Sequence, residues 1–118
     1  MDAAQGASWL AFAEIKEIMV IREIARFVIK PEETDAFASA AQSCIPMFRA
    51  ARGFRSFSLE QSVEVENVFY LFVEWEALED HTVHFRKSAG YQQWRSRVGH
   101  LFFEEPQVCH MKVVHESA

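Results

Sequence analysis

A tryptophan and a histidine that lie six positions apart are the side chains best placed in this chain to do chemistry. Trp75 ends an apolar run that begins at Phe69, and His81 follows in the segment 77–87, whose spacing predicts a helix. A strand with large apolar groups on both faces is typically covered by other layers on both sides. The end of this strand and the first turns of the next helix then border the same crevice. There the Trp75 ring would lie beside His81, a base whose ordinary pKa is about 6.5.

This pair suits the oxygenation of a small aromatic molecule. Dioxygen reacts slowly with closed-shell organic molecules, but a deprotonated phenol, quinol or anthrone can itself supply the electron that starts the reaction. The protein then has to provide a base, a dry aromatic slot, and a donor or cation beside the developing anion. We expect His81 to be the base and Trp75 to form part of the slot. We expect Arg95, or else Arg26, beside the anion. The other substrate-binding residues that we predict are Tyr91, Trp94, Phe72 and Phe85.

Each of these residues also has a purely structural interpretation, which the sequence leaves open. His81 is also what a surface or capping histidine near a helix start looks like. Trp75, Tyr91 and Trp94 have the spacing of ordinary core residues. Arg95 fits a solvated helix face.

Other chemistries find less support in the residue pattern. His81 and His84 are three residues apart and can touch one metal ion, but no HExxH motif or nearby third ligand accompanies them. The glycines have neither the GxGxxG nor the P-loop spacing, and no Ser or Cys lies in a nucleophile elbow. Cys44 and Cys109 are expected to be two buried thiols in a reducing compartment. We therefore predict neither a metal nor a cofactor.

The composition limits the class of protein. The chain of 118 residues is long enough for one domain with its own core, and half of its residues are hydrophobic, eleven of them Phe. A net charge of −5 with scattered Lys and Arg argues against a nucleic-acid surface. No run is apolar enough to span a membrane, and residues 1–17 lack the pattern of a secretory signal. We expect a cytoplasmic protein in which residues 1–17 form an appendage, with a short amphipathic helix after Ser8.

The rest of the chain, 18–118, predicts one domain of alternating strands and helices. Strands are expected at 18–29, 54–61, 69–75 and 108–115, the middle two joined as a hairpin by a turn at 64–67. The first helix starts at Pro31, is kinked at Pro46 and is followed by Gly53. The second spans 77–87, and Ser88 caps a further helix carrying Tyr91 and Trp94.

This order of elements, βαββαβ, is the ferredoxin-like plan, an α+β fold with an antiparallel sheet. Its two helices cover one face of the sheet only. The strand 69–75 is apolar on both faces, with Phe69, Leu71, Val73 and Trp75 on one side and Tyr70 and Phe72 on the other, so the face that the helices leave bare has to be buried as well. A second copy of the chain is the expected cover, so we predict a homodimer.

The chain resembles the antibiotic biosynthesis monooxygenases, a family of dimeric α+β barrel proteins. The residues that carry the resemblance are Lys30-Pro31-Glu32-Glu33, Arg52-Gly53-Phe54, and Trp75 followed by His81, Ser88 and Tyr91. The resemblance covers about Ile18 to Val114. It implies a monooxygenase that oxidises a quinol or anthrone type of substrate with dioxygen and without metal or flavin. In this comparison Trp75 and Arg95 match site residues of anthrone-oxidising members, whereas Leu71 stands where those members have an Asn.

Two alternatives remain open at this stage. One is a dimer of the same fold that binds or sequesters a small aromatic molecule without catalysis. The other is a haem-degrading monooxygenase, which in this superfamily uses an Asn on the first strand. That alternative is disfavoured because the only Asn is Asn67, in the hairpin turn.

Overall fold

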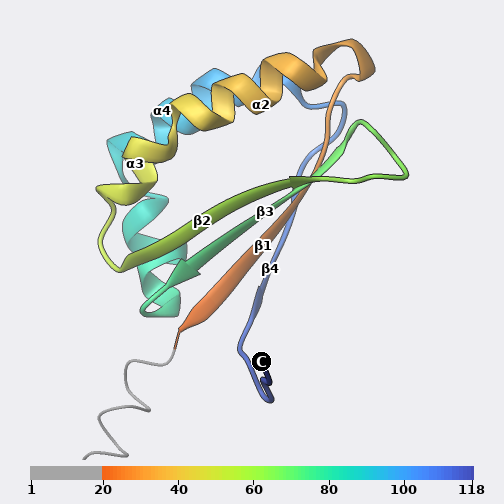
Figure 1. Cartoon of the computed structure of the whole chain (residues 1–118). Coiled ribbons are helices and arrows are strands. Elements are labelled where there is room, and N and C mark those ends of the chain that lie inside the picture. Colours follow the sequence, from red (N-terminus) through yellow and green to blue (C-terminus); the bar gives the residue numbers. More distant parts are fainter. Residues whose placement is uncertain (1–19) are drawn as a thin grey trace, which may run out of the picture.

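The computed structural model describes residues 20–118, which form a four-stranded antiparallel sheet with helices on one face (Figure 1). The predicted appendage 1–17 lies outside these residues. The strands are β1 (Ile21–Val28), β2 (Phe54–Gln61), β3 (Val68–Trp75) and β4 (Gln107–Met111), and the helices are α2 (Thr34–Ser43), α3 (Ile45–Arg49) and α4 (Ala89–Val98). The strand order β2-β3-β1-β4 gives the ferredoxin-like α+β fold predicted from the sequence. No helix among the described residues is long and apolar enough to cross a membrane.

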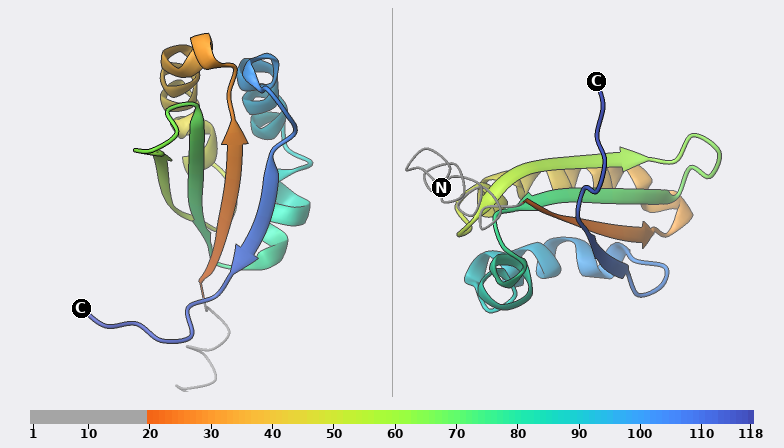
Figure 2. Two further views of the ribbon diagram at one scale, coloured as in Figure 1. Left: turned by 90° about the vertical axis from the view of Figure 1, so that its right-hand side faces the viewer. Right: turned by 90° about the horizontal axis from the view of Figure 1, so that it is seen from below.

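The sheet has one buried face and one face that the helices leave uncovered (Figure 2). Burial alternates along β1 and β3 with the period of two that a strand requires. The alternate residues Ala25 and Phe27 of β1 and Leu71, Val73 and Trp75 of β3 pack beneath the helices. Helices α2, α3 and α4 add Phe37, Phe48 and Trp94 to this core, whose aromatic rings lie largely edge to face.

The chain between β1 and β2 follows the predicted helix with two differences. Pro31 opens a 3₁₀ turn, Pro31–Glu33, before α2 begins. At Cys44 the helix breaks, and α3 starts with Pro46 in its first turn, where the missing amide hydrogen costs nothing. The predicted kink at Pro46 is thus a break between two helices. Gly53 lies four residues beyond the end of α3 rather than directly after it, in the turn that leads into β2.

The segment after β3 also differs from the predicted regular helix. Residues Asp80–Phe85 are π-helical, with the Arg86 amide bonding to the carbonyl of His81, five residues back. In an α-helix Asp80 and Phe85 would point about 140° apart, at 100° per residue. The wider π turn keeps Asp80, His81 and Phe85 all buried on one side. Beyond it, Ser88 caps α4 as predicted, accepting a hydrogen bond from the Tyr91 amide at 3.1 Å.

Gly53 and Asp80 lock the π-helical segment against the start of β2. The φ of Gly53 is +76°, in the left-handed region that favours glycine. A Cβ atom at this position would collide with the Asp80 carboxylate. That carboxylate accepts a hydrogen bond from the Ala77 amide at 3.1 Å and lies 3.6 Å from the Arg52 guanidinium. The position of Asp80, and of His81 after it, therefore depends on the absence of a side chain at residue 53.

Gly53→Ala should lower the free energy of unfolding by about 1–3 kcal/mol, the usual cost of a non-glycine residue held in the left-handed region, with the clash against Asp80 adding to it. Gly99→Ala is the matched control, because a Cβ atom there meets nothing within 4 Å and φ is helical. The control should be neutral or slightly stabilising. Urea denaturation of the two variants measures both effects, and equal stabilities would contradict the lock.

Candidate functional site

The centre of the site is a carboxyl group buried on the helix side of the sheet. Glu23 of β1 takes the inward position between the strand end and Ala25, and only 5% of it is exposed. Trp75, at the end of β3, donates its indole Nε1–H to Oε1 of Glu23 at 3.0 Å. His81, which is 3% exposed, places Nε2 3.3 Å from the same oxygen. Its ring also stacks on Trp75, with centroids 5.7 Å apart. Both of these polar contacts use Oε1 of the carboxyl group.

A second histidine reaches the site from the edge strand. His110 of β4 is the direct cross-strand partner of Glu23 in the β1–β4 register. Its Nε2 lies 2.7 Å from Nδ1 of His81, which is a hydrogen bond. With the His81–His110 hydrogen bond and the 3.3 Å contact between His81 Nε2 and Glu23 Oε1, which is within reach of a hydrogen bond, Glu23, His81 and His110 form one continuous chain. It runs from the buried carboxyl group to the half-buried edge of the sheet.

Burial changes the proton affinities of all three groups. Desolvation raises the pKa of Glu23 to about 7, although the Trp75 hydrogen bond and the Arg86 charge act in the opposite direction. Desolvation, with the nearby His110 and Arg86, lowers the pKa of His81 to about 3. The pKa of His110 is lowered as well, by burial and then by Arg86. At neutral pH His81 is therefore uncharged, and its contact with Glu23 is a hydrogen bond rather than an ion pair. The group that titrates near neutrality is Glu23, not His81 as its ordinary pKa suggested.

A small cavity of about 40 Å³ adjoins the carboxyl group. Five residues of the predicted site line it: His81, Arg95, Tyr91, Trp94 and Phe85. Glu23 and Arg86, which the sequence did not single out, line it too. Its walls are mainly apolar and include the aromatic rings of Phe27, Phe48, Phe85, Tyr91 and Trp94. Arg86 and Arg95 bring positive charge to its lining, and the Arg95 guanidinium lies 3.9 Å from the Glu105 carboxylate.

Two predicted residues and one alternative lie elsewhere. Trp75 is completely buried behind Glu23 and His81, where it supports the site without lining the cavity. Phe72 is on the uncovered face of the sheet, stacked on Tyr70 with centroids 6.4 Å apart. The period of two along a strand places residues 72 and 75 on opposite faces, so one pocket cannot contain both. Arg26 is on the uncovered face as well, in a separate hollow with Tyr70.

The family of the chain follows from a comparison with known proteins. The family model for antibiotic biosynthesis monooxygenases matches residues 20–97, which include Glu23, Trp75 and His81. The chain belongs to the antibiotic biosynthesis monooxygenase family. His110 lies beyond the matched residues.

The chain is also similar to individual proteins. The uncharacterized protein YczJ of Bacillus subtilis (strain 168) is 34% identical over 95 residues, which are 80% of this chain and 100% of that protein. A crystal structure of a proposed antibiotic biosynthesis monooxygenase from Bordetella bronchiseptica is 37% identical, with a TM-score of 0.81 over 82% of this chain and 99% of that one. A protein of the same description from Nitrosomonas europaea, 20% identical, shares the fold with a TM-score of 0.74, covering 85% of this chain and 95% of that one.

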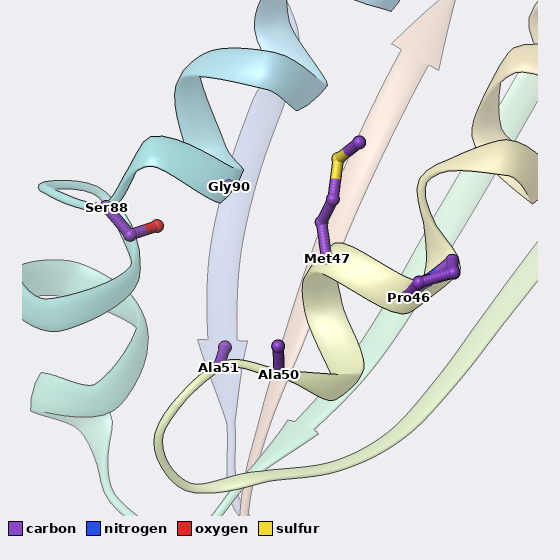
Figure 3. Close-up of a pocket in the computed structure, with 6 residues that line it drawn as sticks. All are labelled: Pro46, Met47, Ala50, Ala51, Ser88 and Gly90. Atoms are coloured by element: carbon purple, nitrogen blue, oxygen red, sulfur yellow. The ribbon is translucent and has the colours of Figure 1, made fainter.

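A larger hollow in the structure has different properties. It measures about 380 Å³ and lies between α3 and the start of α4, lined by Pro46, Met47, Ala50, Ala51, Ser88 and Gly90 (Figure 3). None of these side chains ionises, so the hollow offers no acid or base. Within residues 20–118 no group of three His, Cys, Asp or Glu side chains is arranged to hold a metal ion. The ionisable chemistry of this fold is concentrated around Glu23.

The pKa shifts predict opposite pH dependences of stability for Glu23 and His81. The Glu23 pKa rises from 4.5 to about 7 on folding, so the stability that this group contributes is present below pH 4.5 and is lost as pH rises through 7. The His81 pKa falls from 6.5 to about 3, so its contribution is present above pH 6.5 and is lost as pH falls through 3. The free energy of unfolding of Glu23→Gln, relative to wild type, should therefore increase between pH 4.5 and 7.

Urea denaturation at a series of pH values measures this difference, in which the titration of all other groups largely cancels. Glu66→Gln, at an exposed position of the β2–β3 turn, is the matched control and should show no trend. A pH-independent difference for Glu23→Gln would mean that the buried carboxyl group keeps an ordinary pKa.

Proposed function

We propose that this protein is a monooxygenase that deprotonates a small planar aromatic substrate of the quinol or anthrone type and lets the resulting anion react with dioxygen, without metal or flavin. One observation carries the proposal: a buried carboxyl group with a pKa of about 7 borders a cavity that is lined by aromatic side chains and by the cationic residues Arg86 and Arg95. A general base works best when its pKa is near the working pH. Strongly shifted pKa values of this kind cluster at functional sites.

In this proposal Glu23 accepts the proton, with His81 as its hydrogen-bond partner. Oε1 is held by Trp75 and His81, which leaves Oε2 to reach the substrate. Arg95 and Arg86 stabilise the anion that forms. The anion gives one electron to dioxygen, and the two radicals combine to a peroxide anion. Glu23 returns its proton to this peroxide, which then loses water to leave a new carbonyl group. One oxygen atom ends in the product, the other in water, and Glu23 is again ionised.

The cavity has to widen to admit an aromatic ring. Its volume of about 40 Å³ suffices for water or dioxygen, whereas ligand pockets typically measure about 300–1,000 Å³. Five of the residues that line it are only half-buried or exposed, namely Arg86, Tyr91, Arg95, Pro106 and Val108. In the proposal these side chains move apart when the substrate enters and then close over it, which excludes water from the base.

We also propose that the working unit is a cytoplasmic homodimer joined through the uncovered face of the sheet. That face carries Ile24, Tyr70 and Phe72 beside Arg22, whose Nε is buried without a hydrogen-bond partner among the described residues. A hollow of about 290 Å³ lies there, lined by Ile24, Arg26, Tyr70, Gln107, Val108 and Cys109. An apolar face with an unsatisfied buried donor is better explained by a covering partner than by water. Both cysteines are free thiols, which suits a reducing compartment; Cys44 is buried as expected, whereas Cys109 is exposed on the edge strand β4, contrary to the expectation.

The purified protein should consume dioxygen with at least one member of a panel of quinols and anthrones. In the free enzyme kcat/KM should rise with pH through about 7, because Glu23 must be ionised to accept a proton. Glu23→Gln should lower turnover by roughly 10²–10⁴-fold, the usual contribution of a general base. An oxygen electrode measures both effects, and Glu66→Gln, far from the cavity, should retain the wild-type rate.

The same panel separates catalysis from binding alone. Saturable binding of a planar ligand by calorimetry, with no oxygen uptake at any pH, would favour a protein that sequesters an aromatic molecule. A wild-type rate in Glu23→Gln would place the base elsewhere.

Light scattering should give about twice the chain mass at micromolar concentration, since stable interfaces bury more than about 1,000 Å². Phe72→Lys places a charge in the proposed interface and should yield monomers. Val63→Lys, at a turn residue that is 93% exposed, adds the same charge outside it and should leave the dimer intact. A wild-type protein that stays monomeric would refute the proposed interface.

A further inference from the structure

His110 has an unusual place in the site, because its side chain does not line the cavity and its hydrogen bond goes to His81 rather than to Glu23. Its Nε2 lies 2.7 Å from the His81 Nδ1. β4 is the edge strand, and the register of β1 with β4 puts His110 directly opposite Glu23. His81 bridges the two from the π-helical segment. The ring of His110 is half-buried, whereas Glu23 and His81 are nearly inaccessible to water.

A neutral imidazole carries one N–H, so His81 can donate on only one side. When Nε2 carries the hydrogen, it donates to the ionised Glu23, and Nδ1 accepts from the Nε2–H of His110. When Nδ1 carries the hydrogen, it donates to a bare Nε2 of His110, and the His81 Nε2 accepts from a protonated Glu23. These two arrangements satisfy every group in the chain of hydrogen bonds, and they differ in the protonation state of Glu23.

We propose that His110 is a positioning residue that sets the tautomer of His81 and, through it, the proton affinity of Glu23. Among residues 20–118, His110 is the partner that the structure gives to the His81 Nδ1 in either state. Without His110 the ionised state leaves Nδ1 as an unpaired acceptor, whereas the protonated state leaves a buried N–H donor unpaired, which is the rarer and costlier case. The loss of His110 therefore penalises the protonated state more. The half-buried edge of the sheet thereby helps to set the basicity of the buried carboxyl group.

The other charged and titratable groups around this chain of hydrogen bonds do not bridge to Glu23. Arg86 follows the π-helical segment and, like Arg95 and Tyr91 of α4, lines the cavity. Asp80 precedes His81 but is engaged by Arg52 and the Ala77 amide. Trp75 donates to Glu23 and does not titrate. These groups shift the field at Glu23, whereas His110 acts on the His81 tautomer itself.

The tautomer of His81 can be followed in the substrate-free protein by ¹⁵N NMR of the imidazole rings, while ¹³C NMR of the carboxyl group follows Glu23. In wild type the hydrogen of His81 should move from Nε2 to Nδ1 as pH falls through the Glu23 midpoint. In His110→Phe this exchange should disappear, and the proton affinity of Glu23 should drop about tenfold, a fall of about one pKa unit. His84→Phe, at an exposed histidine of the same segment, is the control and should behave as wild type.

His110→Gln is the conservative variant, because its amide can donate to Nδ1 or accept from Nδ1–H without titrating. It should restore both the tautomer exchange and the Glu23 midpoint, which a loss of packing alone does not explain. If His110→Phe fails to fold, His110→Leu, which also lacks a partner for Nδ1, takes its place in the comparison with wild type and His110→Gln. A single His81 tautomer across the Glu23 titration, or equal midpoints in wild type and a folded His110→Phe, overturns the proposal.

The inference rests on the proposed function only where Glu23 is taken as the base, and the measurements separate the two. If Glu23 is the base, the midpoint of the kcat/KM profile should fall by the same amount in His110→Phe. A tautomer exchange without any oxygen uptake would leave the role of His110 standing and remove the monooxygenase. If the protein consumes dioxygen but His110→Phe leaves the midpoint of the kcat/KM profile unchanged, the monooxygenase stands and the role of His110 is refuted.

Discussion

The burial of one carboxyl group governs the arrangement of this protein around its cavity. A carboxyl group on the covered face of a sheet loses its hydration, and that loss has to be offset by hydrogen bonds or by uptake of a proton. Both occur at Glu23, which accepts from Trp75 and has a pKa of about 7. The end of β3 therefore carries an indole rather than an aliphatic side chain. The π-helical turn Asp80–Phe85 that follows places the imidazole of His81 beside the same oxygen atom, Oε1 of Glu23.

Much of the fold could be predicted because its signals are local. The alternation along residues 54–61 and 69–75, with polar residues between them, defines a hairpin whose first strand has the predicted bounds. Ser88 marks the start of α4 through the capping bond that its side chain makes. The π-helical turn was not predictable in this way, because apolar residues three and four apart read the same in α- and π-helices. The end of β4 at Met111 depends on pairing with β1, which no local pattern records.

The cavity lining was predicted more completely than its chemistry. Aromatic residues at helical spacing, such as Tyr91 and Trp94, point to a core or a pocket from the sequence alone. The sequence pattern that marks Glu23 becomes informative only once the buried face of β1 is known. Glu23 is an acidic residue that alternates with Ala25 and Phe27, so it lies on the same buried face of the strand. His110 carries none, because its role depends on the register between β1 and β4 and on a contact with a residue 29 positions away. The pKa values of His81 and Glu23 are properties of burial, which only the folded chain defines.

The three hydrogen-bonded groups come from the beginning, middle and end of the described chain, and this has a consequence for how the molecule opens. Glu23 and Trp75 are 52 positions apart and join two strands in the interior of the sheet, so their contact is broken only when the whole sheet unfolds. His110 sits on a short edge strand held by β1 alone, which can detach at a much smaller free-energy cost. Amide hydrogen exchange would then register two classes of motion at one site. Rare global opening breaks the contact between Glu23 and Trp75, and frequent fraying of β4 releases His110 together with Val108, which lines the cavity beside Glu23.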